Sequence, residues 1–375
     1  MMSPVTRVTI SVPPRPYDAV IESGLLERAG ACLRDLPNFP AKLFIVAPAP
    51  VRRRWGKKLM ASLANSGFRA RLLEMPDGER HKRLATVEGL AEKLVALGAE
   101  RSSGIVALGG GVTGDVAGFL ASIYLRGVDV VQIPTTVQAQ VDAAIGGKTG
   151  VNLRAGKNLL GTFHQARAVL IDPEVLSTLP EREFRAGLFE SLKAGIIGNP
   201  GLFEQLENGK WKRLRRDPAA LEWVIAESVR LKAEVVSADE REGGLRRVLN
   251  LGHTIGHALE AETGYRHFLH GEAVAWGMIA AANIAAEAGL LEEGVARRVC
   301  SAILAPGPLP KVEVRPRNIL RRLQADKKTR NGVVHFVLPR EIGKVEIVND
   351  VPEKLVLDAV DELQAVSRKL LSREL

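Results

Sequence analysis

The stretch Gly104-Ile105-Val106-Ala107-Leu108-Gly109-Gly110-Gly111-Val112-Thr113-Gly114-Asp115 decides the fold class. An apolar run, a glycine cluster and the start of a helical pattern follow one another, which predicts a strand, a loop and a helix. Glycines in such a loop let the backbone approach a phosphate, whose charge suits the N-terminus of a helix. The spacing of Gly109, Gly111 and Gly114 satisfies G-x-G-x-x-G. However, the loop lies deep in the chain and no acidic residue ends the next strand, so we expect a phosphate loop other than the first Rossmann turn. A plain tight turn is the alternative.

Strand patterns and helical patterns alternate on both sides of this stretch, which is typical of a βαβ sheet. The expected helices are 51–66, 85–97 and 115–125. The expected strands are 5–12, 43–47, 70–75, 104–108, 128–134 and 168–172. This order predicts a mostly parallel sheet with helices on both faces.

The pattern changes after residue 178. Apolar residues recur at helical spacing through 183–197, 221–238, 255–262 and 271–288, while strand patterns remain only near 333–338 and 345–347. We therefore expect an α/β domain over residues 1–178 and an all-α domain over residues 179–375. Open α/β sheets bind ligands beyond the carboxyl ends of their strands, so the expected active site is a cleft between the two domains.

Composition narrows the class of protein. The 375 residues carry a formal net charge of +9 and two cysteines, Cys32 and Cys300. The basic residues are scattered and not interleaved with aromatic ones, which argues against nucleic acid and favours small anionic ligands. Isolated thiols and the lack of a signal pattern at the N-terminus favour a cytoplasmic enzyme. The apolar stretch 273–291 contains Glu287 and predicts a buried helix, so we expect no membrane association.

A second glycine-rich run is Gly146-Gly147-Lys148-Thr149. It resembles part of a P-loop but lacks the four-residue spacer after the first glycine, which excludes an ATPase of that type. Together with Lys157 and Asn158, the lysines and backbone amides can still bind phosphate or a polyol. A glycine-rich surface loop is the alternative.

The helical half contains a candidate metal site. His253 and His257 lie one turn apart on one helix face, and His270 precedes the next apolar helix. Glu190 and Lys193 share a face of another helix. A catalytic zinc takes three nitrogen or oxygen ligands and keeps one open position, which Glu190 and two of the histidines would supply. Satisfied core histidines are the rival interpretation, and the charged run 232–246 reads by itself as a solvated helix end.

These stretches occur together, in this order, in the 3-dehydroquinate synthase family, which the chain resembles from about residue 79 to residue 277. The further blocks that carry the resemblance are Pro76-Asp77-Gly78-Glu79 with Lys82, Tyr124-Leu125-Arg126-Gly127, Pro134-Thr135-Thr136, 141–151, Lys232, 239–246, Asn250-Leu251-Gly252-His253, Leu269-His270-Gly271-Glu272 and Asp326-Lys327-Lys328. The resemblance implies an NAD-binding α/β domain and a helical metal-binding domain. It also implies a homodimer in which Arg126 reaches the substrate of the neighbouring subunit.

The resemblance also implies roles for individual residues. Zinc or cobalt would bind Glu190, His253 and His270. NAD would contact Glu79, Lys82, Gly110, Gly111, Asp115, Thr135, Thr136, Asp142, Lys148 and Lys157. The substrate would contact Arg126, Lys148, Lys157, Asn158, Lys232, Arg246, Asn250, and Lys327 or Lys328. The implied catalytic groups are His257, which would act as an acid and base, Lys193, Asp142 and Glu242.

The implied reaction converts 3-deoxy-D-arabino-heptulosonate 7-phosphate to 3-dehydroquinate and phosphate in the shikimate pathway. C5 is oxidised by NAD, phosphate leaves by β-elimination, NADH returns its hydride, and an aldol addition closes the ring. Sugar-phosphate cyclases for substrates without a carboxylate are one alternative, and the family resemblance of Arg246, Asn250 and His257 argues against them. A polyol or glycerol dehydrogenase is another, and it needs no phosphate or carboxylate pocket.

One departure from the family concerns the adenosine ribose. Where relatives usually carry a small polar or acidic cluster, this chain has Ala47-Pro48-Ala49-Pro50. The resemblance therefore implies a weaker or differently built contact with that ribose.

Overall fold

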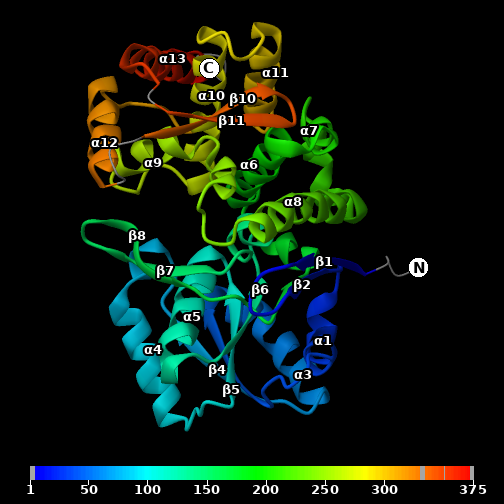
Figure 1. The fold of residues 1–375 in the computed structure, drawn as a ribbon. Coiled ribbons are helices and arrows are strands. Elements are labelled where there is room, and N and C mark those ends of the chain that lie inside the picture. Colours follow the sequence, from blue (N-terminus) through cyan, green and yellow to red (C-terminus); the bar gives the residue numbers. More distant parts are fainter. Residues whose placement is uncertain (1–4, 330–333, 350, 372–375) are drawn as a thin grey trace. The chain divides into compact units, whose positions relative to one another are not determined.

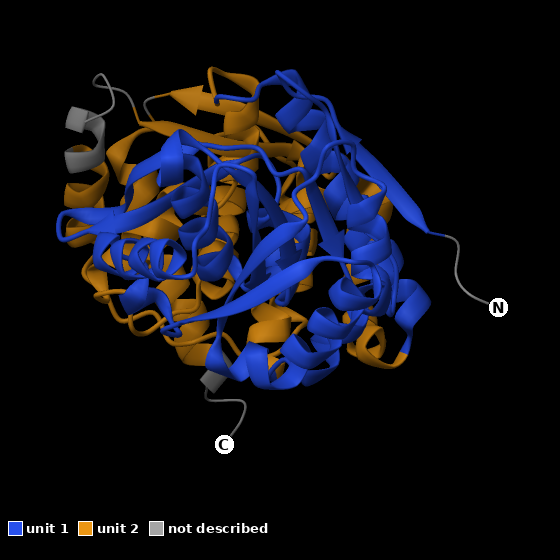
Figure 2. Cartoon of the chain, turned by 90° about the horizontal axis from the view of Figure 1, so that it is seen from below, with its two compact units in different colours: residues 1–180, 217–241 blue, residues 181–216, 242–375 orange. Residues whose placement is uncertain are grey.

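The computed structural model describes residues 5–329, 334–349 and 351–371, and the side chains of 5–324, 334–349 and 351–369. Two compact units divide the chain (Figure 2). Unit 1 comprises residues 1–180 and 217–241, and unit 2 comprises residues 181–216 and 242–375.

Unit 1 is built on a seven-stranded sheet with the order β1-β2-β9-β6-β5-β3-β4. Its strands are β1 (Thr6–Ile10), β2 (Tyr17–Ile21), β3 (Lys42–Pro48), β4 (Arg69–Met75), β5 (Ser103–Gly109), β6 (Asp129–Pro134) and β9 (Ala168–Ile171). Only β1 and β2 pair in antiparallel fashion, whereas every other neighbouring pair is parallel. The predicted mostly parallel sheet is confirmed, and of its seven strands only β2 was missing from the sequence prediction.

Helices cover the sheet of unit 1. They are α1 (Ala29–Arg34), α2 (Ala49–Val51), α3 (Lys57–Asn65), α4 (Leu84–Ala96) and α5 (Gly111–Ile123). In Figure 1, α4 and α5 lie to one side of the strands, and α1 and α3 lie to the other. Because both faces are covered, β5 is buried along its whole length, which explains its continuous apolar sequence.

A separate antiparallel pair, β7 (Lys148–Leu153) and β8 (Gly156–Phe163), was not predicted. The sequence did not predict these strands because their glycines weaken the strand pattern. Here they allow close approach of the two backbones: a Cβ at Gly161 would lie 2.2 Å from the carbonyl oxygen of Thr149. The run that resembled a P-loop therefore leads into a strand, where a P-loop would lead into a helix.

Helix α8 (Pro218–Ala238) lies well after the expected domain boundary at residue 178. Its residues were therefore expected in the second domain, but it belongs to unit 1, where it packs on β1 and on the turn η5 (Ala139–Ala143). Asp217 caps its first turn by accepting a hydrogen bond from the backbone N–H of Ala220 at 3.0 Å, and Pro218 occupies the first turn. Its helical periodicity resembles that of the unit 2 helices, so periodicity could not assign it to a unit.

Unit 2 is mainly helical. Its helices are α6 (Glu181–Gly198), α7 (Pro200–Leu206), α9 (His253–Glu262), α10 (His270–Glu287), α11 (Glu293–Leu304), α12 (Pro316–Thr329) and α13 (Glu353–Leu371). It also contains the antiparallel pair β10 (His335–Glu341) and β11 (Lys344–Asn349). The helical character of this domain is confirmed. The domain is not all-α, however, because β10 and β11 form at the remaining strand patterns.

Helix α10 forms the core of unit 2. Its apolar residues are buried on all sides, Trp276 among them, as predicted for the stretch that begins at Ala273. None of the helices in the described part of the chain is both long and apolar enough to cross a membrane.

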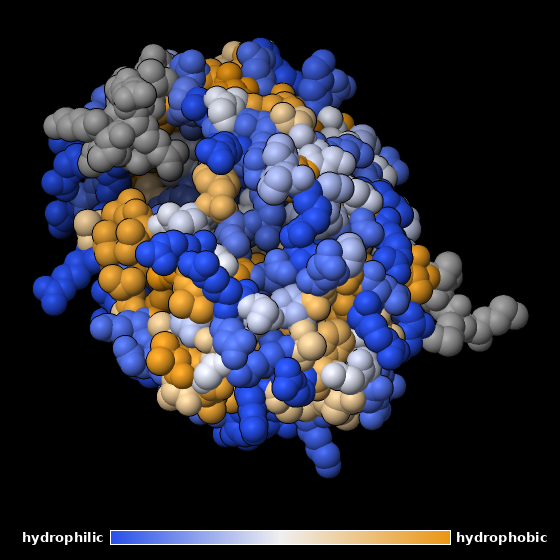
Figure 3. All heavy atoms as spheres, turned by 60° about the horizontal axis from the view of Figure 1, so that its bottom comes forward, coloured by the Kyte–Doolittle hydropathy of each residue, from blue (hydrophilic) through white to orange (hydrophobic). Residues whose placement is uncertain are grey.

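Some large apolar side chains remain at the surface. In unit 1 they include Ile123, Leu125, Leu153, Leu159 and Phe163. Figure 3 shows one face of the molecule, on which apolar side chains gather in several places among hydrophilic ones. Exposed apolar groups of this kind are common at contacts between subunits.

Candidate functional site

Three helices of unit 2 approach one another at glycines. A Cβ at Gly271, in the first turn of α10, would lie 1.9 Å from the carbonyl oxygen of Ala186 in α6. A Cβ at Gly277 would lie 1.8 Å from the carbonyl oxygen of Gly252, which precedes α9. Since no side chain fits at either contact, the backbones of α6, α9 and α10 can pack directly together.

This packing brings three histidines together. The ring nitrogens of His253, His257 and His270 that could bind a metal all lie within 4.8 Å of one another. The ring centroids are 5.1 Å apart for His253 and His257, 5.2 Å for His253 and His270, and 5.7 Å for His257 and His270. Such spacing suits a single shared ion.

A buried carboxylate joins the histidines. Glu190 in α6 is 2% exposed, with its Oε1 3.4 Å from Nε2 of His270 and its Oε2 2.5 Å from Nζ of Lys193. These are ion-pair distances, but neither carboxylate oxygen accepts a well-formed hydrogen bond from any described residue. A buried carboxylate normally has such partners, so this arrangement fits a cation bound beside Glu190.

Charge and burial shift the ionisation of these groups. Burial raises the pKa of Glu190, but Lys193 and the imidazoles of His270 and His253 outweigh it and hold that pKa well below its usual range. Burial and then Lys193 lower the pKa of His253 far below its ordinary value. Burial would also lower the pKa of His270, yet contacts with Glu190 and Glu260 raise it to about 9. The group thus combines an ionised carboxylate with a neutral His253.

The donor set matches a zinc or cobalt ion, which takes imidazole nitrogen and carboxylate oxygen. The predicted ligands Glu190, His253 and His270 lie in one group. His257 lies in the same group, more exposed than the other two histidines. Which three of these four side chains bind the ion stays a prediction.

Three predicted residues lie just before α9: the substrate contacts Arg246 and Asn250 and the catalytic group Glu242. Arg246 is 2% exposed in the turn η8 (Leu245–Asn250). Nδ2 of Asn250 donates to Oε1 of Glu242 at 2.8 Å. Glu242 has a φ of 61°, a conformation that is rare for residues other than glycine and often found at functional sites. Glu242 and Asn250 are therefore hydrogen-bonded to each other. Arg246 is buried, whereas most arginines lie at a protein surface.

In unit 1, the first glycine-rich loop joins β5 to α5, as predicted. Gly109 in β5 pairs with Pro134 in the parallel strand β6, so the loop lies beside Thr135 and Thr136. A Cβ at Gly110 would lie 3.0 Å from Cγ2 of Thr136. The predicted NAD-binding residues of these two loops are thus neighbours at the carboxyl ends of adjacent strands, where ligands of α/β sheets bind.

A polar network beside this loop collects further predicted residues around Lys82, which is buried. Nζ of Lys82 donates to Asp115 and to Oδ1 of Asn158. Nδ2 of Asn152 donates to Oε1 of Glu79 at 2.7 Å, and its Oδ1 accepts from the backbone N–H of Asn158 at 2.9 Å. Nζ of Lys157 lies 3.9 Å from Oε1 of Glu79.

Asn152 was not among the predicted site residues, although it links Glu79 to Asn158. It follows the glycine-rich block 141–151, and an asparagine in a strand gives little signal in a sequence. Burial raises the pKa of Asp115, and the Lys82 ammonium opposes that shift. The network therefore combines the buried Lys82 with acidic groups that are partly exposed, Glu79 and Asp115.

Asp142 and Lys232 form a second pair in unit 1. Nζ of Lys232, in α8, lies 2.5 Å from Oδ1 of Asp142 and 2.7 Å from its carbonyl oxygen. Lys232 is buried, so the charged run that read as a solvated helix end contains a buried cation. Periodicity alone could not reveal this, because the partner lies 90 residues away.

Two further predicted residues are exposed. Lys148 begins β7 and is exposed. Arg126 is exposed on the turn after α5, with a φ of 70°. The side chains of Lys327 and Lys328 lie outside the described residues.

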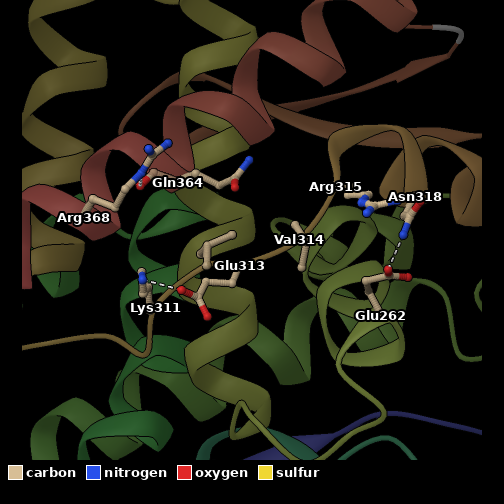
Figure 4. A pocket seen from close by; sticks show the side chains of 9 residues that line it. Glu262, Lys311, Glu313, Val314, Arg315, Asn318, Gln364 and Arg368 are labelled. Atoms are coloured by element: carbon tan, nitrogen blue, oxygen red, sulfur yellow. Dashed lines mark hydrogen bonds and ion pairs between the residues drawn. The ribbon is translucent and has the colours of Figure 1, made fainter.

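A hollow in unit 2 is separate from the histidines. It has a volume of about 650 Å³ and is lined by residues of α9, α12, α13 and the segment before α12. Figure 4 shows Glu262 bonded to Asn318 and Lys311 paired with Glu313, while Arg315 and Arg368 lie apart. Its charges largely satisfy one another and do not converge on one point.

Comparison with known proteins identifies the family. Residues 72–186 match the family described as 3-dehydroquinate synthase N-terminal, and residues 187–329 match 3-dehydroquinate synthase C-terminal. A 3-dehydroquinate synthase from Koribacter versatilis (strain Ellin345) is 54% identical over 363 residues, which cover 97% of this chain and 99% of that protein.

Two solved structures are also similar. The 2-epi-5-epi-valiolone synthase of Streptomyces hygroscopicus subsp. jinggangensis 5008, bound to NAD⁺ and Zn²⁺, has a TM-score of 0.86 and 33% identity, covering 95% of this chain and 99% of that one. A 2-deoxy-scyllo-inosose synthase in complex with carbaglucose-6-phosphate, NAD⁺ and Co²⁺ has a TM-score of 0.83 and 28% identity, with the same coverage. With both family halves matched in order and a close relative spanning nearly the whole chain, this chain belongs to the 3-dehydroquinate synthase family.

Proposed function

We propose that the chain converts 3-deoxy-D-arabino-heptulosonate 7-phosphate to 3-dehydroquinate and phosphate, by transient oxidation, β-elimination, reduction and aldol closure. The observation that carries this proposal is the group formed by Glu190, Lys193 and the three histidines. It occurs in a chain that is 54% identical to a 3-dehydroquinate synthase.

We propose Glu190, His253 and His270 as ligands of a zinc or cobalt ion, and the loops at Gly110 and Thr136 as the NAD site. When bound, the metal supplies a positive charge that acidifies a substrate hydroxyl, and NAD supplies a temporary hydride acceptor. The buried oxygens of Glu190, which accept no well-formed hydrogen bond from the described residues, support the metal assignment. The glycine loop before α5 supports the NAD site.

Four side chains of the chain would handle protons and charge. His257 is the most exposed of the three histidines, so it can accept the proton of the hydroxyl that is oxidised. Lys193 is buried beside Glu190 and would stabilise negative charge on the oxygen of that substrate hydroxyl. Asp142 and Glu242 are held in place by Lys232 and Asn250 and would orient substrate hydroxyls.

The anionic ends of the substrate would be bound by basic residues. Arg246, with Lys232 and Asn250, suits the carboxylate, because a guanidinium can donate two parallel hydrogen bonds to it. The proposed phosphate-side residues are Arg126, Lys148, Lys157, Asn158, and Lys327 or Lys328. Cyclases for substrates without a carboxylate are the second candidate, since two such enzymes resemble this fold at 33% and 28% identity. The higher identity to a 3-dehydroquinate synthase favours the first candidate.

We also propose a homodimer in which Arg126 contacts the phosphate bound by the neighbouring subunit. Arg126 is exposed, and the exposed apolar residues Ile123 and Leu125 precede it closely in the chain. Buried in a subunit contact, these side chains would stabilise the dimer.

We also propose that the protein is cytoplasmic. Both cysteines are free thiols, as is usual for proteins of that reducing compartment.

Release of phosphate tests the proposed reaction. The protein is incubated with catalytic NAD and the heptulosonate phosphate, with and without a chelator. We expect stoichiometric phosphate and 3-dehydroquinate without lasting NADH, and loss of both products on chelation. Build-up of NADH equal to the substrate consumed, without phosphate, would instead identify a polyol dehydrogenase.

A further inference from the structure

A buried glutamate of α9 faces the histidine group and has no role in the function proposed above. Glu260 is 2% exposed, and its Oε2 lies 3.3 Å from Nδ1 of His270. His253, His257 and Glu260 are spaced four and three residues apart, so they follow one face of the helix. That face therefore presents a carboxylate as well as two imidazoles.

The two ring nitrogens of His270 point to different carboxylates. Nδ1 faces Glu260, whereas Nε2 lies 3.4 Å from Oε1 of Glu190. An ionised carboxylate can only accept a hydrogen bond. The contact with Glu260 is a hydrogen bond, whereas Oε1 of Glu190 accepts none from the described residues. In the neutral ring, Glu260 therefore favours the tautomer in which Nδ1 carries the proton and Nε2 keeps its lone pair.

His253 is held in a similar way. Its Nδ1 lies 3.2 Å from the carbonyl oxygen of Leu251, which also can only accept. Both histidines thus have an acceptor at Nδ1 and the opposite nitrogen left for another bond. Metal-bound histidines usually show this pattern, in which the second nitrogen donates to a carboxylate or a carbonyl.

We propose that Glu260 is a positioning residue, which fixes the ring and the tautomer of His270 so that Nε2 is directed at the metal. This inference rests on the proposed function, because it assumes that His270 binds a metal. Glu260 itself is not a ligand in the proposal, since its near oxygen meets the nitrogen of His270 that faces away from Glu190. It acts on the ion through the imidazole alone.

Metal affinity measured on purified protein tests this role. The apo forms of the unchanged protein, Glu260→Ala and Glu260→Gln are titrated with Zn²⁺ against a chromophoric chelator. Because partners of metal-bound histidines typically contribute 10- to 100-fold in affinity, we expect Glu260→Ala to weaken binding by about that factor. The glutamine amide oxygen can still accept from Nδ1, so Glu260→Gln should recover most of the loss.

A matched control comes from the same helix. Glu262 lies two residues further along α9 but bonds to Asn318 and Arg322, away from the histidines. Glu262→Gln should leave zinc affinity within about twofold. The ¹⁵N shifts of labelled histidines in the metal-free proteins, measured above pH 9 where His270 is neutral, give a second readout. Loss of the acceptor should change the tautomer of His270 in Glu260→Ala, whereas Glu260→Gln keeps an acceptor and should preserve it.

The outcomes separate this inference from the proposed function. If the unchanged protein binds no zinc, the metal assignment fails. If it binds zinc and a folded Glu260→Ala binds equally well, only the role of Glu260 fails. Equal losses in Glu260→Ala and Glu260→Gln would also overturn it, because a merely structural role predicts no rescue by the amide. If Glu260→Ala does not fold, the test rests on Glu260→Gln. That variant must keep the native tautomer of His270 and bind zinc with near-native affinity.

Discussion

His253 and His257 occupy consecutive turns of one helix, yet their surroundings differ. His253 has an acceptor at Nδ1 and a pKa held well below its ordinary value by burial, whereas His257 is exposed. A neutral, oriented imidazole suits a metal ligand, and an accessible one suits proton transfer. This difference supports the two roles proposed for the pair, which spacing alone could not assign.

Metal content and activity should separate these roles. We expect His253→Ala and Glu190→Gln to lose zinc and activity together, because each removes a ligand. His257→Ala should keep close to one zinc per chain while its kcat falls by about 10²- to 10⁴-fold, the usual contribution of an acid or base. Zinc is measured by atomic emission and kcat by phosphate release.

Glu183→Gln is the control for Glu190→Gln, because it changes an exposed glutamate in the same helix. It should retain both zinc and activity. Full zinc content in Glu190→Gln and His253→Ala, or loss of zinc in His257→Ala, would contradict the ligand assignment.

Metal binding should depend on pH through His270. In the metal-free protein its pKa is raised to about 9, so near neutral pH the ring carries a proton that the ion must displace. Zinc affinity should therefore rise by about tenfold per pH unit toward pH 9, as long as one proton is released. Calorimetry in buffers of different ionisation enthalpy counts that proton, and a pH-independent affinity would refute the expectation.

At the scale of elements, the site depends on how closely α6 and α10 pack. Gly271→Ala would place a Cβ 1.9 Å from the carbonyl oxygen of Ala186, which forces the helices apart. Such overpacking typically destabilises by about 1–3 kcal/mol. We expect a lower melting temperature and weaker zinc binding, since Glu190 and His270 lie on the two separated helices.

A matched substitution is available in unit 1. Gly89 in α4 has no atom within 4 Å of an added Cβ, so Gly89→Ala should raise the free energy of unfolding by up to about 1 kcal/mol, the helix preference of alanine over glycine. Chemical denaturation measures both variants. A Gly271→Ala protein as stable as the unchanged one would mean that the helices can shift at little cost.

At the scale of the whole molecule, the proposed dimer predicts complementation between two inactive variants. Arg126→Ala and His253→Ala should each be inactive alone, because each damages every site of its own homodimer. If Arg126 serves the neighbouring subunit, a mixed dimer contains one doubly damaged site and one intact site. Equal mixing should then restore about a quarter of the sites of the unchanged enzyme.

Subunit exchange is verified with differently tagged chains, and phosphate release is the measurement. Mixed dimers that form but remain inactive would show that Arg126 serves its own subunit. The apolar residues Ile123 and Leu125 offer a separate check. Replacing both by serine should weaken the dimer in analytical ultracentrifugation.

Much of this protein could be predicted from local patterns. Alternating apolar runs predicted the parallel strands β3, β4, β5, β6 and β9, and helical spacing predicted α6, α9 and α10. The family motifs named the histidines and Glu190. These features are local, since a run of a few residues carries both the periodicity and the motif.

Other features depended on contacts between distant residues. The β7–β8 pair escaped prediction because its glycines serve a backbone contact. Helix α8 belongs to unit 1 because it packs on β1. Lys232 pairs with Asp142, which lies 90 residues away in the sequence. Glu260 acquired its place beside His270 only when α9 and α10 packed together.

The amino-acid sequence by itself determined the parallel sheet, the helical second half and the family to which the chain belongs. Only the tertiary structure decided which buried side chains face one another, namely Lys82 with Asp115, Lys232 with Asp142, and His270 between Glu190 and Glu260. The physical reason is that periodicity reports the burial of a face within one element, whereas the partner of a buried charge is chosen by the packing of separate elements.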